Sequence, residues 1–305
     1  MFVTKVKVRV PATTANLGPG FDVLGMALNL YNYIEMKEMD SGLEISVEGE
    51  GKGILPGDSS SIVYEIAWKV FKLAGYSPRG IKIKLTNNIP IARGLGSSAA
   101  ALVGGAVAAN ALSGSRLSLE ELINLASEME GHPDNVVPAA VGGFTLCINT
   151  VDEGIIFRKI DPPEVYAVAA VPFFELSTKK ARDVLPKMVS IKDAVFNMGR
   201  TSMLVYAVQT GELRLLKNVM QDRLHQLYRV SLVPGMENVF EAALEAGALG
   251  VFLSGAGPTV IALTQDKSSI GKIKEAMKIT FLNHDMDCSL LELEPDAQGA
   301  VIMEK

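Results

Sequence analysis

The chain has 305 residues, of which 48% are hydrophobic and 21% charged, a composition that fits a globular enzyme of one large or two ordinary domains. A net charge of −5 gives no sign of a nucleic acid partner, and no signal peptide or apolar run long enough to span a bilayer is visible, so we expect neither nucleic acid nor a membrane as a partner. Cys147 and Cys288 lie far apart and form neither a metal motif nor a disulfide framework, so the chain is expected in the reducing cytoplasm.

The first half of the chain contains several short stretches with the pattern of β-strands. Valines alternate with charged residues over 3–10, where we expect a strand that Pro11 stops and a loop over 11–20 follows. Residues 81–85 alternate strictly between apolar side chains and lysines, which predicts a strand with one face in water. Other apolar runs predict strands over 28–36, 43–47 and 142–148.

Helices are expected between these strands. Apolar residues recur at helical spacing over 58–74, and Gly75 should end that helix. The alanine-rich stretch 98–112 predicts a second helix. Residues 118–121 read Ser-Leu-Glu-Glu, a capping box that begins a third helix, which Gly131 should end.

The second half also mixes strands and helices, so the fold class is α+β in both halves. The acidic, turn-rich residues 152–154 and the pair Pro162-Pro163 indicate a boundary, and we expect two domains over 1–155 and 156–305. Strands are expected over 165–171, 250–253, 259–263 and 288–293, the last closing the chain, and helices over 178–185, 192–208, 213–227, 237–246 and 269–281.

Residues 90–100 carry the strongest functional signal, and they read Pro-Ile-Ala-Arg-Gly-Leu-Gly-Ser-Ser-Ala-Ala. Gly94 and Gly96 follow an expected strand, and Ser97 and Ser98 lead into an expected helix. Backbone N–H groups at a helix N-terminus bind anions, and glycines let the backbone approach a phosphate. Serine hydroxyls can reach phosphate oxygens or a Mg²⁺ ion that they hold. The expected ligand is therefore a nucleotide.

Two other phosphate-binding patterns fit this loop less well. Residues 94–99 fit the dinucleotide pattern G-x-G-x-x-A, but the preceding strand alternates with lysines and no strand with a terminal acid follows, which argues against a Rossmann unit. The P-loop pattern is absent because no lysine follows Gly96. A purely structural turn remains the alternative.

Acidic and polar residues at the end of the third helix are candidates for a site. Glu130 lies in the last turn, where a carboxylate faces the negative end of the helix dipole. A role as Mg²⁺ ligand would explain that position, and a solvated surface acid is the alternative. Residues 132–135, His-Pro-Asp-Asn, could contact a substrate or form an ordinary turn.

Four more residues are open to two interpretations each. Asn16 and Asp22 flank glycines in the first loop, where they could bind a ligand or form Asx turns. Arg182 and Arg229 could be surface residues or a clamp for a carboxylate or phosphate.

Three segments, in this order along the chain, resemble the three motifs of the GHMP small-molecule kinases. They are 11–22 (Pro-Ala-Thr-Thr-Ala-Asn-Leu-Gly-Pro-Gly-Phe-Asp), 90–100, and 253–259 (Leu-Ser-Gly-Ala-Gly-Pro-Thr). The resemblance runs the length of the chain. It implies the two-domain GHMP kinase fold, with an ATP-binding N-terminal domain similar to the second domain of ribosomal protein S5, a ferredoxin-like C-terminal domain, and a homodimer.

Further segments resemble one branch of that family. Residues 16–22, 130–136, 177–182 and 228–235 are typical of the branch that phosphorylates L-homoserine. The resemblance implies that ATP and L-homoserine, with Mg²⁺, give ADP and O-phospho-L-homoserine on the route to threonine.

The resemblance also implies roles for site residues. An amino acid zwitterion needs an anion for its ammonium group, here Asp22, and cations for its carboxylate, here Arg182 and Arg229. The other implied substrate contacts are Asn16, His132, Asn135 and Gly255. The implied ATP loop is Pro90, Ile91, Ala92, Arg93, Gly94, Leu95, Gly96, Ser97, Ser98, Ala99 and Ala100, and Mg²⁺ would be held by Glu130 with Ser97 or Ser98.

The mechanism is expected to be phosphoryl transfer through a loose transition state, in which positioning and charge neutralisation dominate. Asp134, Asn135 and Glu130 are the catalytic candidates. Other family members use a lysine–aspartate pair as base, and residues 134–135 leave open whether a base exists here. We favour direct attack by the hydroxyl, whose proton is lost late to a phosphate oxygen. The alternatives are a related kinase acting on mevalonate or a sugar, and a non-catalytic nucleotide-binding regulator.

Overall fold

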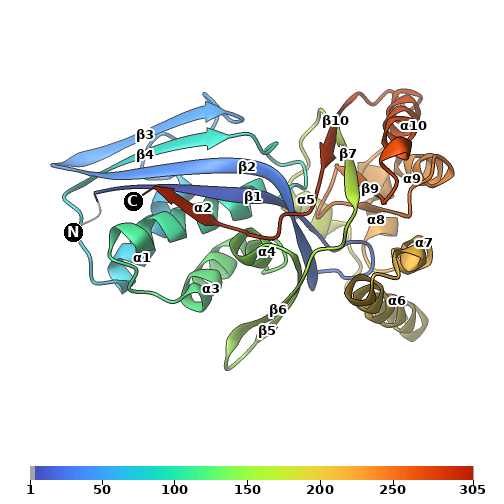
Figure 1. Cartoon of the computed structure of the whole chain (residues 1–305), viewed down its shortest axis with the longest axis horizontal. Helices are drawn as coiled ribbons and strands as arrows, with labels where there is room; N and C mark the ends of the chain where they lie inside the picture. The colour runs from blue at the N-terminus through green and yellow to red at the C-terminus, as the bar shows by residue number, and fades with distance from the viewer. Residues whose placement is uncertain (1–3, 305) are drawn as a thin grey trace.

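Two β-sheets lie end to end in the computed structural model, which describes residues 4–304 (Figure 1). The first sheet has the order β11-β1-β2-β4-β3, and β5 pairs with both β2 and β6. The second sheet has the order β10-β7-β9-β8 and is antiparallel throughout. Helices accompany both sheets, which fits the predicted α+β class.

The first half contains β1 (Lys5–Ala15), β2 (Leu24–Met39), β3 (Gly42–Gly49), α1 (Ile62–Leu73), β4 (Gly80–Asn87), α2 (Ser97–Leu112), α3 (Leu119–Glu130), α4 (Val136–Val141), β5 (Phe144–Thr150) and β6 (Gly154–Ile160). The second half contains β7 (Tyr166–Pro172), α5 (Thr178–Asp183), α6 (Ile191–Thr210), α7 (Leu216–Val219), α8 (Gln226–Arg229), α9 (Met236–Glu245), β8 (Gly250–Leu253), β9 (Val260–Thr264), α10 (Ile270–Leu282) and β10 (Cys288–Leu293). The chain then returns to the first sheet as β11 (Val301–Glu304).

Helix α2 is the centre of the first half. It packs against β1 and β2 on one side and against α1, α3 and α4 on the others, all on one face of the sheet (Figure 1). A Cβ at Gly104 would lie 2.3 Å from Cδ1 of Ile34, and one at Gly105 would lie 2.9 Å from Cγ2 of Ile66. The run of alanine and glycine is therefore the sequence of a helix buried on nearly all sides, with its N-terminus at the loop 90–96.

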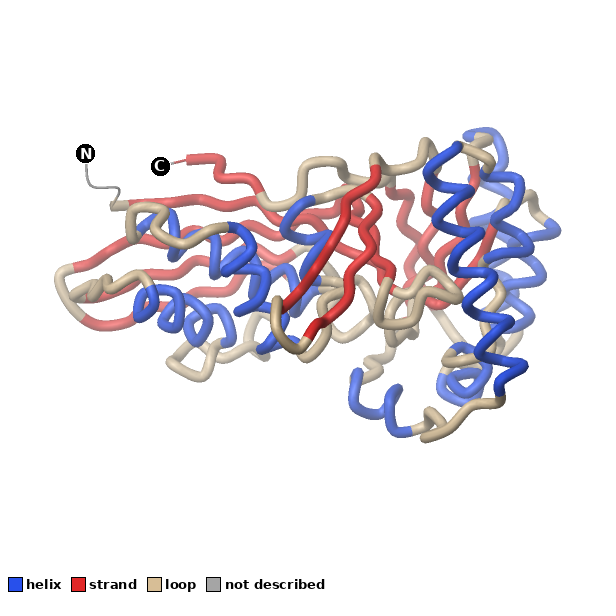
Figure 2. Tube along the Cα trace, turned by 90° about the horizontal axis from the view of Figure 1, so that it is seen from below, coloured by secondary structure: helices blue, strands red, loops and turns tan. Residues whose placement is uncertain are grey.

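The second sheet is covered on both faces. Alternate residues of β7 belong to two hydrophobic clusters: Val168 and Ala170 pack with α9 and α10, whereas Ala167 and Ala169 pack with α6, α7 and the first half. This explains why β7 is an unbroken apolar run rather than an alternating one. Figure 2 shows this sheet between its helices and the first half of the molecule.

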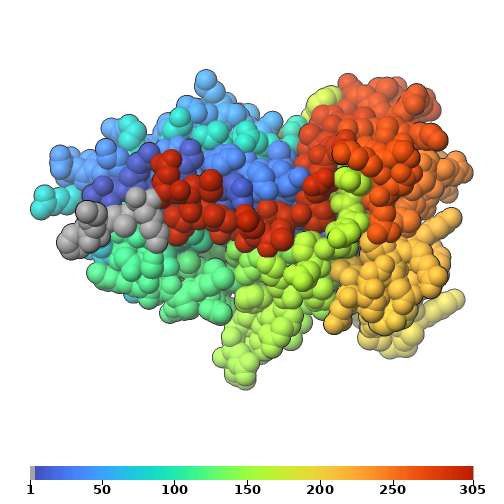
Figure 3. All heavy atoms as spheres, viewed as in Figure 1, coloured from blue at the N-terminus to red at the C-terminus, as the bar shows by residue number. Residues whose placement is uncertain are grey.

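The end of the chain crosses back over the first half. The segment after β10 lies along the N-terminal half in Figure 3, and β11 pairs antiparallel with β1. The prediction that the strand over 288–293 closes the chain is wrong, because β11 follows it. β11 has four residues, and its partner lies at the opposite end of the sequence, so no local pattern indicates it.

The prediction that Pro11 stops the first strand, with a loop over 11–20, is wrong. β1 continues through Pro11 to Ala15. Its register with β2 shifts between Pro11 and Ala12, so the proline occupies an irregularity where its missing N–H is tolerated. The predicted beginning of this strand at Val3 lies outside the described residues.

The single helix predicted over 213–227 is also wrong. The structure has a 3₁₀ turn at Leu213–Leu215, then α7, an irregular stretch and α8. The carboxylate of Asp222 accepts hydrogen bonds from the backbone N–H groups of residues 224, 225 and 226 and from Nδ2 of Asn197. These bonds compete with a continuous helix and start α8 instead.

Smaller differences have local causes. The helix predicted over 58–74 begins at Ile62, because the Asp58 carboxylate accepts the N–H and hydroxyl of Ser60 and holds a turn there. α4 and β6 were not expected, and residues 151–153 form the hairpin turn between β5 and β6. The domain division after residue 155 stays a prediction.

None of the helices described is long and apolar enough to span a membrane.

Candidate active site

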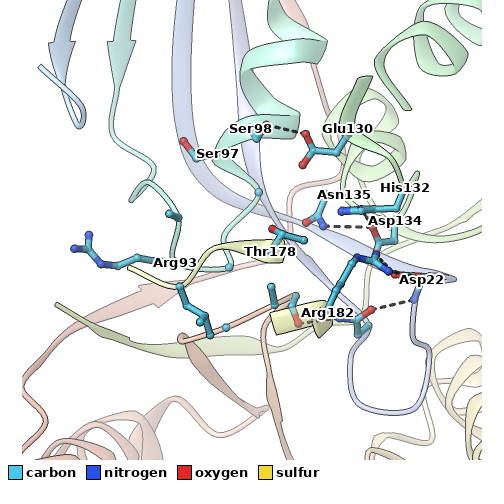
Figure 4. Close-up of a pocket in the computed structure, with 18 of the residues that line it drawn as sticks. Asp22, Arg93, Ser97, Ser98, Glu130, His132, Asp134, Asn135, Thr178 and Arg182 are labelled. Carbon is cyan, nitrogen blue, oxygen red and sulfur yellow. Dashed lines mark hydrogen bonds and ion pairs between the residues drawn. The ribbon is translucent and has the colours of Figure 1, made fainter. Parts of the chain in front are cut away.

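A polar pocket lies where the two halves meet, and segments far apart in the sequence line it (Figure 4). All three motif segments contribute, together with the end of α3, the segment that follows it, α5 and α8. The lining side chains discussed below are Asn16, Phe21, Asp22, Arg93, Ser97, Ser98, Glu130, His132, Asp134, Asn135, Thr178, Arg182 and Arg229.

The glycine loop is packed tightly against the other two motif segments. Gly94 and Gly96 both have positive φ, +79° and +68°. A Cβ at Gly94 would lie 2.3 Å from the carbonyl oxygen of Ser254, and one at Gly96 would lie 1.9 Å from Oγ1 of Thr13. Both glycines are therefore required by the fold of the loop itself. No side chain caps the N-terminus of α2, so its first N–H groups stay available for an anion.

Ser98 and Glu130 place a hydroxyl and a carboxylate side by side near that helix terminus. Oγ of Ser98 donates to Oε2 of Glu130 at 2.7 Å, whereas Ser97 points away from Glu130 (Figure 4). Hydroxyl and carboxylate oxygens are ligands that Mg²⁺ accepts, usually together with phosphate oxygens and water. Residues 4–304 hold no cluster of three or more His, Cys, Asp or Glu side chains fit for a metal. A cation at this position would therefore need oxygen atoms of a bound phosphate as further ligands.

The opposite side of the pocket holds an ion pair between Asp22 and Arg182. Nη1 and Nη2 of Arg182 donate to Oδ2 and Oδ1 of Asp22 at 3.0 and 2.7 Å. This hydrogen bonding raises the pKa of Arg182. Both side chains remain about one-third exposed, at 36% and 35%, so each has room to bind a ligand as well. The structure thus joins the two residues predicted to bind opposite charges of one zwitterion.

Asn16 fixes the loop that carries Asp22. Its Oδ1 accepts the N–H of Asp22 at 3.0 Å, and its Nδ2 donates to the carbonyl of Gly255 at 2.9 Å. Asn16 and Asp22 have φ of 70° and 58°, which Asn and Asp adopt more readily than other residues. The side chain of Asn16 therefore ties the first motif loop to the third.

Arg229 is almost completely buried, with 2% of its surface exposed. Nε donates to the carbonyl of Ala181 at 3.0 Å, and Nη1 lies 3.0 Å from both the carbonyl of Gly255 and Nδ1 of His225. Burial lowers the pKa of Arg229 to about 10, so the guanidinium stays charged at neutral pH. None of the hydrogen bonds found over residues 4–304 uses Nη2, although Arg229 lines the pocket.

The sequence motifs indicate no role for His225, and the structure places its ring against Arg229. It is fully buried, and burial lowers its pKa. Its spacing of four residues from Arg229 is the one sequence signal of this contact, because residues at i and i+4 share a helix face.

The segment after α3 places two of its residues in a hydrogen-bonded pair. Nδ1 of His132 lies 2.6 Å from Oδ1 of Asp134, which is 2% exposed. Burial alone lowers the pKa of His132, but the hydrogen bond and charge of Asp134 outweigh it, and the net shift is upward. Asn135 donates to the same Oδ1 at 3.4 Å and accepts from Thr13 at 2.8 Å.

The positions of two pocket residues, Thr178 and Arg93, differ from their predicted roles. Thr178, which served only as the expected beginning of a helix, lines the pocket. Arg93 lies in the predicted ATP loop, but its guanidinium donates to the carbonyls of Phe173 and Phe174 and points away from the Asp22–Arg182 pair (Figure 4).

A second, more apolar cavity adjoins the polar pocket. It lies between the beginning of α1, the end of β4 and the glycine loop, and shares Ser97, Ser98 and Thr178 with the polar pocket. Apolar side chains on its other walls include Leu55, Pro56, Ile62, Val63, Leu85 and Ile91. Sequence reasoning did not indicate this cavity, because its walls come from four separate segments.

Comparison with known proteins identifies similar chains. Residues 61–143 match the family model of the GHMP kinases N-terminal domain, and residues 204–283 match that of the GHMP kinases C-terminal domain. The homoserine kinase of Moorella thermoacetica is 50% identical over 297 residues, covering 97% of this chain and 99% of that protein. The crystal structure of homoserine kinase from Cytophaga hutchinsonii has a TM-score of 0.90 at 34% identity, covering 99% and 98% of the two chains. L. major mevalonate kinase shares the fold, with a TM-score of 0.73 at 18% identity and 96% of each chain covered.

Proposed function

The chain belongs to the homoserine kinase family of the GHMP kinases, and we infer that it transfers the terminal phosphoryl group of ATP to the side-chain hydroxyl of L-homoserine. The products are ADP and O-phospho-L-homoserine, on the route to threonine. The predicted two-domain GHMP kinase fold and the predicted kinase class are confirmed by this membership. The observation that best supports the substrate is the Asp22–Arg182–Arg229 cluster, which faces the α2 N-terminus across one pocket.

The charged cluster matches the two charges of an amino acid. Asp22 binds the ammonium group, and Arg182 and Arg229 bind the carboxylate. A carboxylate offers about four acceptor sites and a guanidinium five N–H donors. Asp22 and Arg182 can therefore keep their mutual hydrogen bonds while each also binds the substrate. Arg229 contributes Nη2, and the weak hydration of a buried guanidinium favours a charged partner.

The polar residues between the two sides orient the substrate. Asn135 lies between the charged cluster and the α2 N-terminus in Figure 4, where the hydroxyl must meet the phosphoryl group. His132 and Asn16 line the same pocket, and the Gly255 carbonyl fixes both Asn16 and Arg229. We assign Asn16, His132, Asn135 and Gly255 to the substrate side.

ATP spans both cavities. Its phosphates lie on the loop 90–100 at the N-terminus of α2, and its base enters the apolar cavity that shares Ser97 and Ser98 with the pocket. Ser98 and Glu130 would hold Mg²⁺, which supplies positive charge to the phosphate oxygens. The direct bond between Ser98 and Glu130 favours Ser98 over Ser97 in that role.

The transfer forms a bond from the homoserine hydroxyl oxygen to the terminal phosphorus and breaks the bond from that phosphorus to the oxygen that leaves with ADP. Helix α2 directs its N–H groups at the negative charge, and the charged cluster holds the acceptor in line. Asp134 already accepts from His132 and Asn135, so we assign it to orienting these two residues. The hydroxyl proton passes late to an oxygen of the transferred phosphoryl group.

We also propose that the protein is a homodimer in the cytoplasm. Ile191, Val195, Met198 and Tyr206 are between 47% and 82% exposed along α6, an apolar stripe of the kind that subunit contacts cover. Cys147 and Cys288 are free, buried thiols, which fits a reducing compartment.

The first experiment is ADP release from MgATP with L-homoserine, D-homoserine, L-serine, mevalonate and galactose in parallel. We expect release with L-homoserine and not with the others. Release with a different alcohol would replace the substrate and keep the phosphotransferase. Bound ATP without release in any mixture would favour the nucleotide-binding regulator.

A further inference from the structure

The side chain of His225 connects the two segments that carry the charged cluster. Nε2 lies 2.7 Å from the carbonyl oxygen of Gly18, in the loop that leads to Asp22. Nδ1 lies 3.0 Å from Nη1 of Arg229, on α8. One imidazole ring thus touches both the loop of the ammonium-binding carboxylate and the carboxylate-binding guanidinium.

The partners determine the protonation of the ring. A carbonyl oxygen can only accept, so Nε2 carries the hydrogen, and a guanidinium can only donate, so Nδ1 presents its lone pair. The ring is therefore neutral, with one defined tautomer. Complete burial of His225 also lowers its pKa, in the same direction.

The surroundings of the ring are closely packed. Phe21 stacks on it with ring centroids 5.1 Å apart. The Asp222 carboxylate accepts the backbone N–H of His225 at 2.9 Å. Gly18 has φ of +84°, and a Cβ there would lie 2.2 Å from the carbonyl oxygen of Met220, so its loop and the segment before His225 are in direct contact.

The contacts of Arg229 show what the ring contributes. Nε is held by the carbonyl of Ala181 and Nη1 by Gly255 and His225, which fixes the plane of the guanidinium. Nη2 makes none of the hydrogen bonds found over residues 4–304, and Arg229 lines the pocket. Without the Nδ1 acceptor, a buried guanidinium would keep fewer bonds and could rotate about its last bonds.

We propose that neutral His225 is a positioning residue for the substrate carboxylate, because it orients Arg229 and ties that orientation to the loop of Asp22. The proposal rests on the proposed function, in which Arg229 binds the carboxylate of homoserine. Neither the sequence motifs nor the comparisons assign a role to this histidine.

The test compares two amide variants. His225→Gln places its amide near the position of Nε2 and removes the acceptor at Nδ1, whereas His225→Asn places an amide oxygen near Nδ1. We expect His225→Gln to raise the KM for L-homoserine about tenfold or more, since a hydrogen bond to a charged group is lost. His225→Asn should restore much of this loss, and kcat and the KM for ATP should change less than about threefold in both.

A ligand without a carboxylate separates positioning from general damage. L-2-amino-1,4-butanediol has a hydroxymethyl group in place of the homoserine carboxylate, and it is measured as an inhibitor that competes with homoserine. Its inhibition constant should be the same for wild type and His225→Gln, because Arg229 has no carboxylate to bind. A merely structural role for His225 would weaken both ligands alike.

Each outcome has one meaning. His284→Gln, at an exposed position just after α10, is the matched control and should behave as wild type. A folded His225→Gln with unchanged KM for homoserine, or with equal losses for both ligands, would overturn the proposal. Should His225→Gln fail to fold, His225→Ala, which also lacks the acceptor at Nδ1, carries the same two-ligand test against wild type. A wild-type protein without homoserine-dependent ADP release would overturn the proposed function instead.

Discussion

The two sides of the pocket, proposed above to bind the phosphates and the amino acid and called here the phosphate side and the amino acid side, are built in opposite ways. The phosphate side is one contiguous loop whose groups are backbone N–H donors, held in place by glycines without room for a Cβ. The amino acid side consists of side chains from separate segments, with Asp22 and Arg182 meeting from the two halves of the molecule.

This difference predicts how each side responds to substitution. Backbone recognition tolerates the loss of many side chains but not the addition of a methyl group where the loop is packed. Recognition by side chains is weakened by each substitution that removes one charged group, and the fold stays intact. The following predictions test that contrast, from the largest effect to the smallest.

Arg182→Ala should raise the KM for homoserine about 100-fold, because the proposed carboxylate clamp loses one of its two guanidinium groups and Asp22 loses the two hydrogen bonds that it accepts from Arg182. The KM for ATP should change less than about threefold, since the lost contacts touch only the amino acid. Steady-state kinetics with each substrate varied measures both. Arg214→Ala, an arginine that is 83% exposed, is the control. An unchanged KM for homoserine would remove Arg182 from the clamp.

Gly96→Ala should disrupt the phosphate side by adding one methyl group. The new Cβ would lie 1.9 Å from Oγ1 of Thr13 at a φ of +68°, so the loop must shift. We expect kcat/KM for ATP to fall about tenfold or more, with the free energy of unfolding lowered by about 2 kcal/mol. Gly211→Ala has a similar φ of +75° and open space around it, and should show the backbone strain alone. Equal behaviour of the two variants would contradict the packing argument.

Glu130→Gln should raise the Mg²⁺ concentration needed for half-maximal rate about tenfold, because one anionic ligand becomes neutral while the bond from Ser98 can persist. A Mg²⁺ titration at saturating ATP and homoserine measures the shift. Glu128→Gln, on the exposed side of the same helix, is the matched control. If both variants titrate like wild type, Glu130 is a solvated acid.

Asp134→Asn should lower kcat by less than about tenfold, because an amide oxygen can still accept from His132 and no base is lost. A fall of about 100-fold or more would identify Asp134 as a general base and refute direct attack. Single-turnover measurements distinguish the chemical step from product release.

The same variant should change how stability depends on pH. The folded pKa of His132 is raised above its unfolded value of 6.5, chiefly by Asp134 acting against burial. A histidine whose pKa is higher in the folded state contributes its full stabilisation at pH values below the unfolded pKa. This contribution is lost as the pH rises through the folded pKa. The stability difference between wild type and Asp134→Asn should therefore be larger near about pH 5.5 than near about pH 8.5. Denaturant unfolding at both pH values would reveal it, and equal differences would contradict it.

The same contrast explains which parts could be predicted from the sequence. The loop 90–100 was found from its own residues, since glycines, serines and a helix N-terminus adjoin in one stretch. The capping box at Ser118 is confirmed as well, because its two hydrogen bonds are local. The roles of Asp22, Arg182 and Arg229 came from resemblance, and the assignment of these roles stays a prediction.

The parts that were missed depend on contacts between distant segments. Helical periodicity over 213–227 predicted one continuous helix and gave no sign of the break that the Asp222 carboxylate causes. The contact between His225 and Arg229 depends on that break and was therefore missed as well. The choice between Ser97 and Ser98 depended on which hydroxyl faces Glu130, and only the packing of α2 against α3 determines this.

The return of the chain as β11 has a consequence for biosynthesis. β11 follows all the other strands described in the chain, and it covers the edge of β1, the first of them, through pairs such as Lys7 with Glu304. A nascent chain therefore carries an open β1 edge until β11 has been synthesised, and unpaired edges are where strands of neighbouring chains add on. Loss of Val301–Glu304 would leave that edge exposed in the folded molecule.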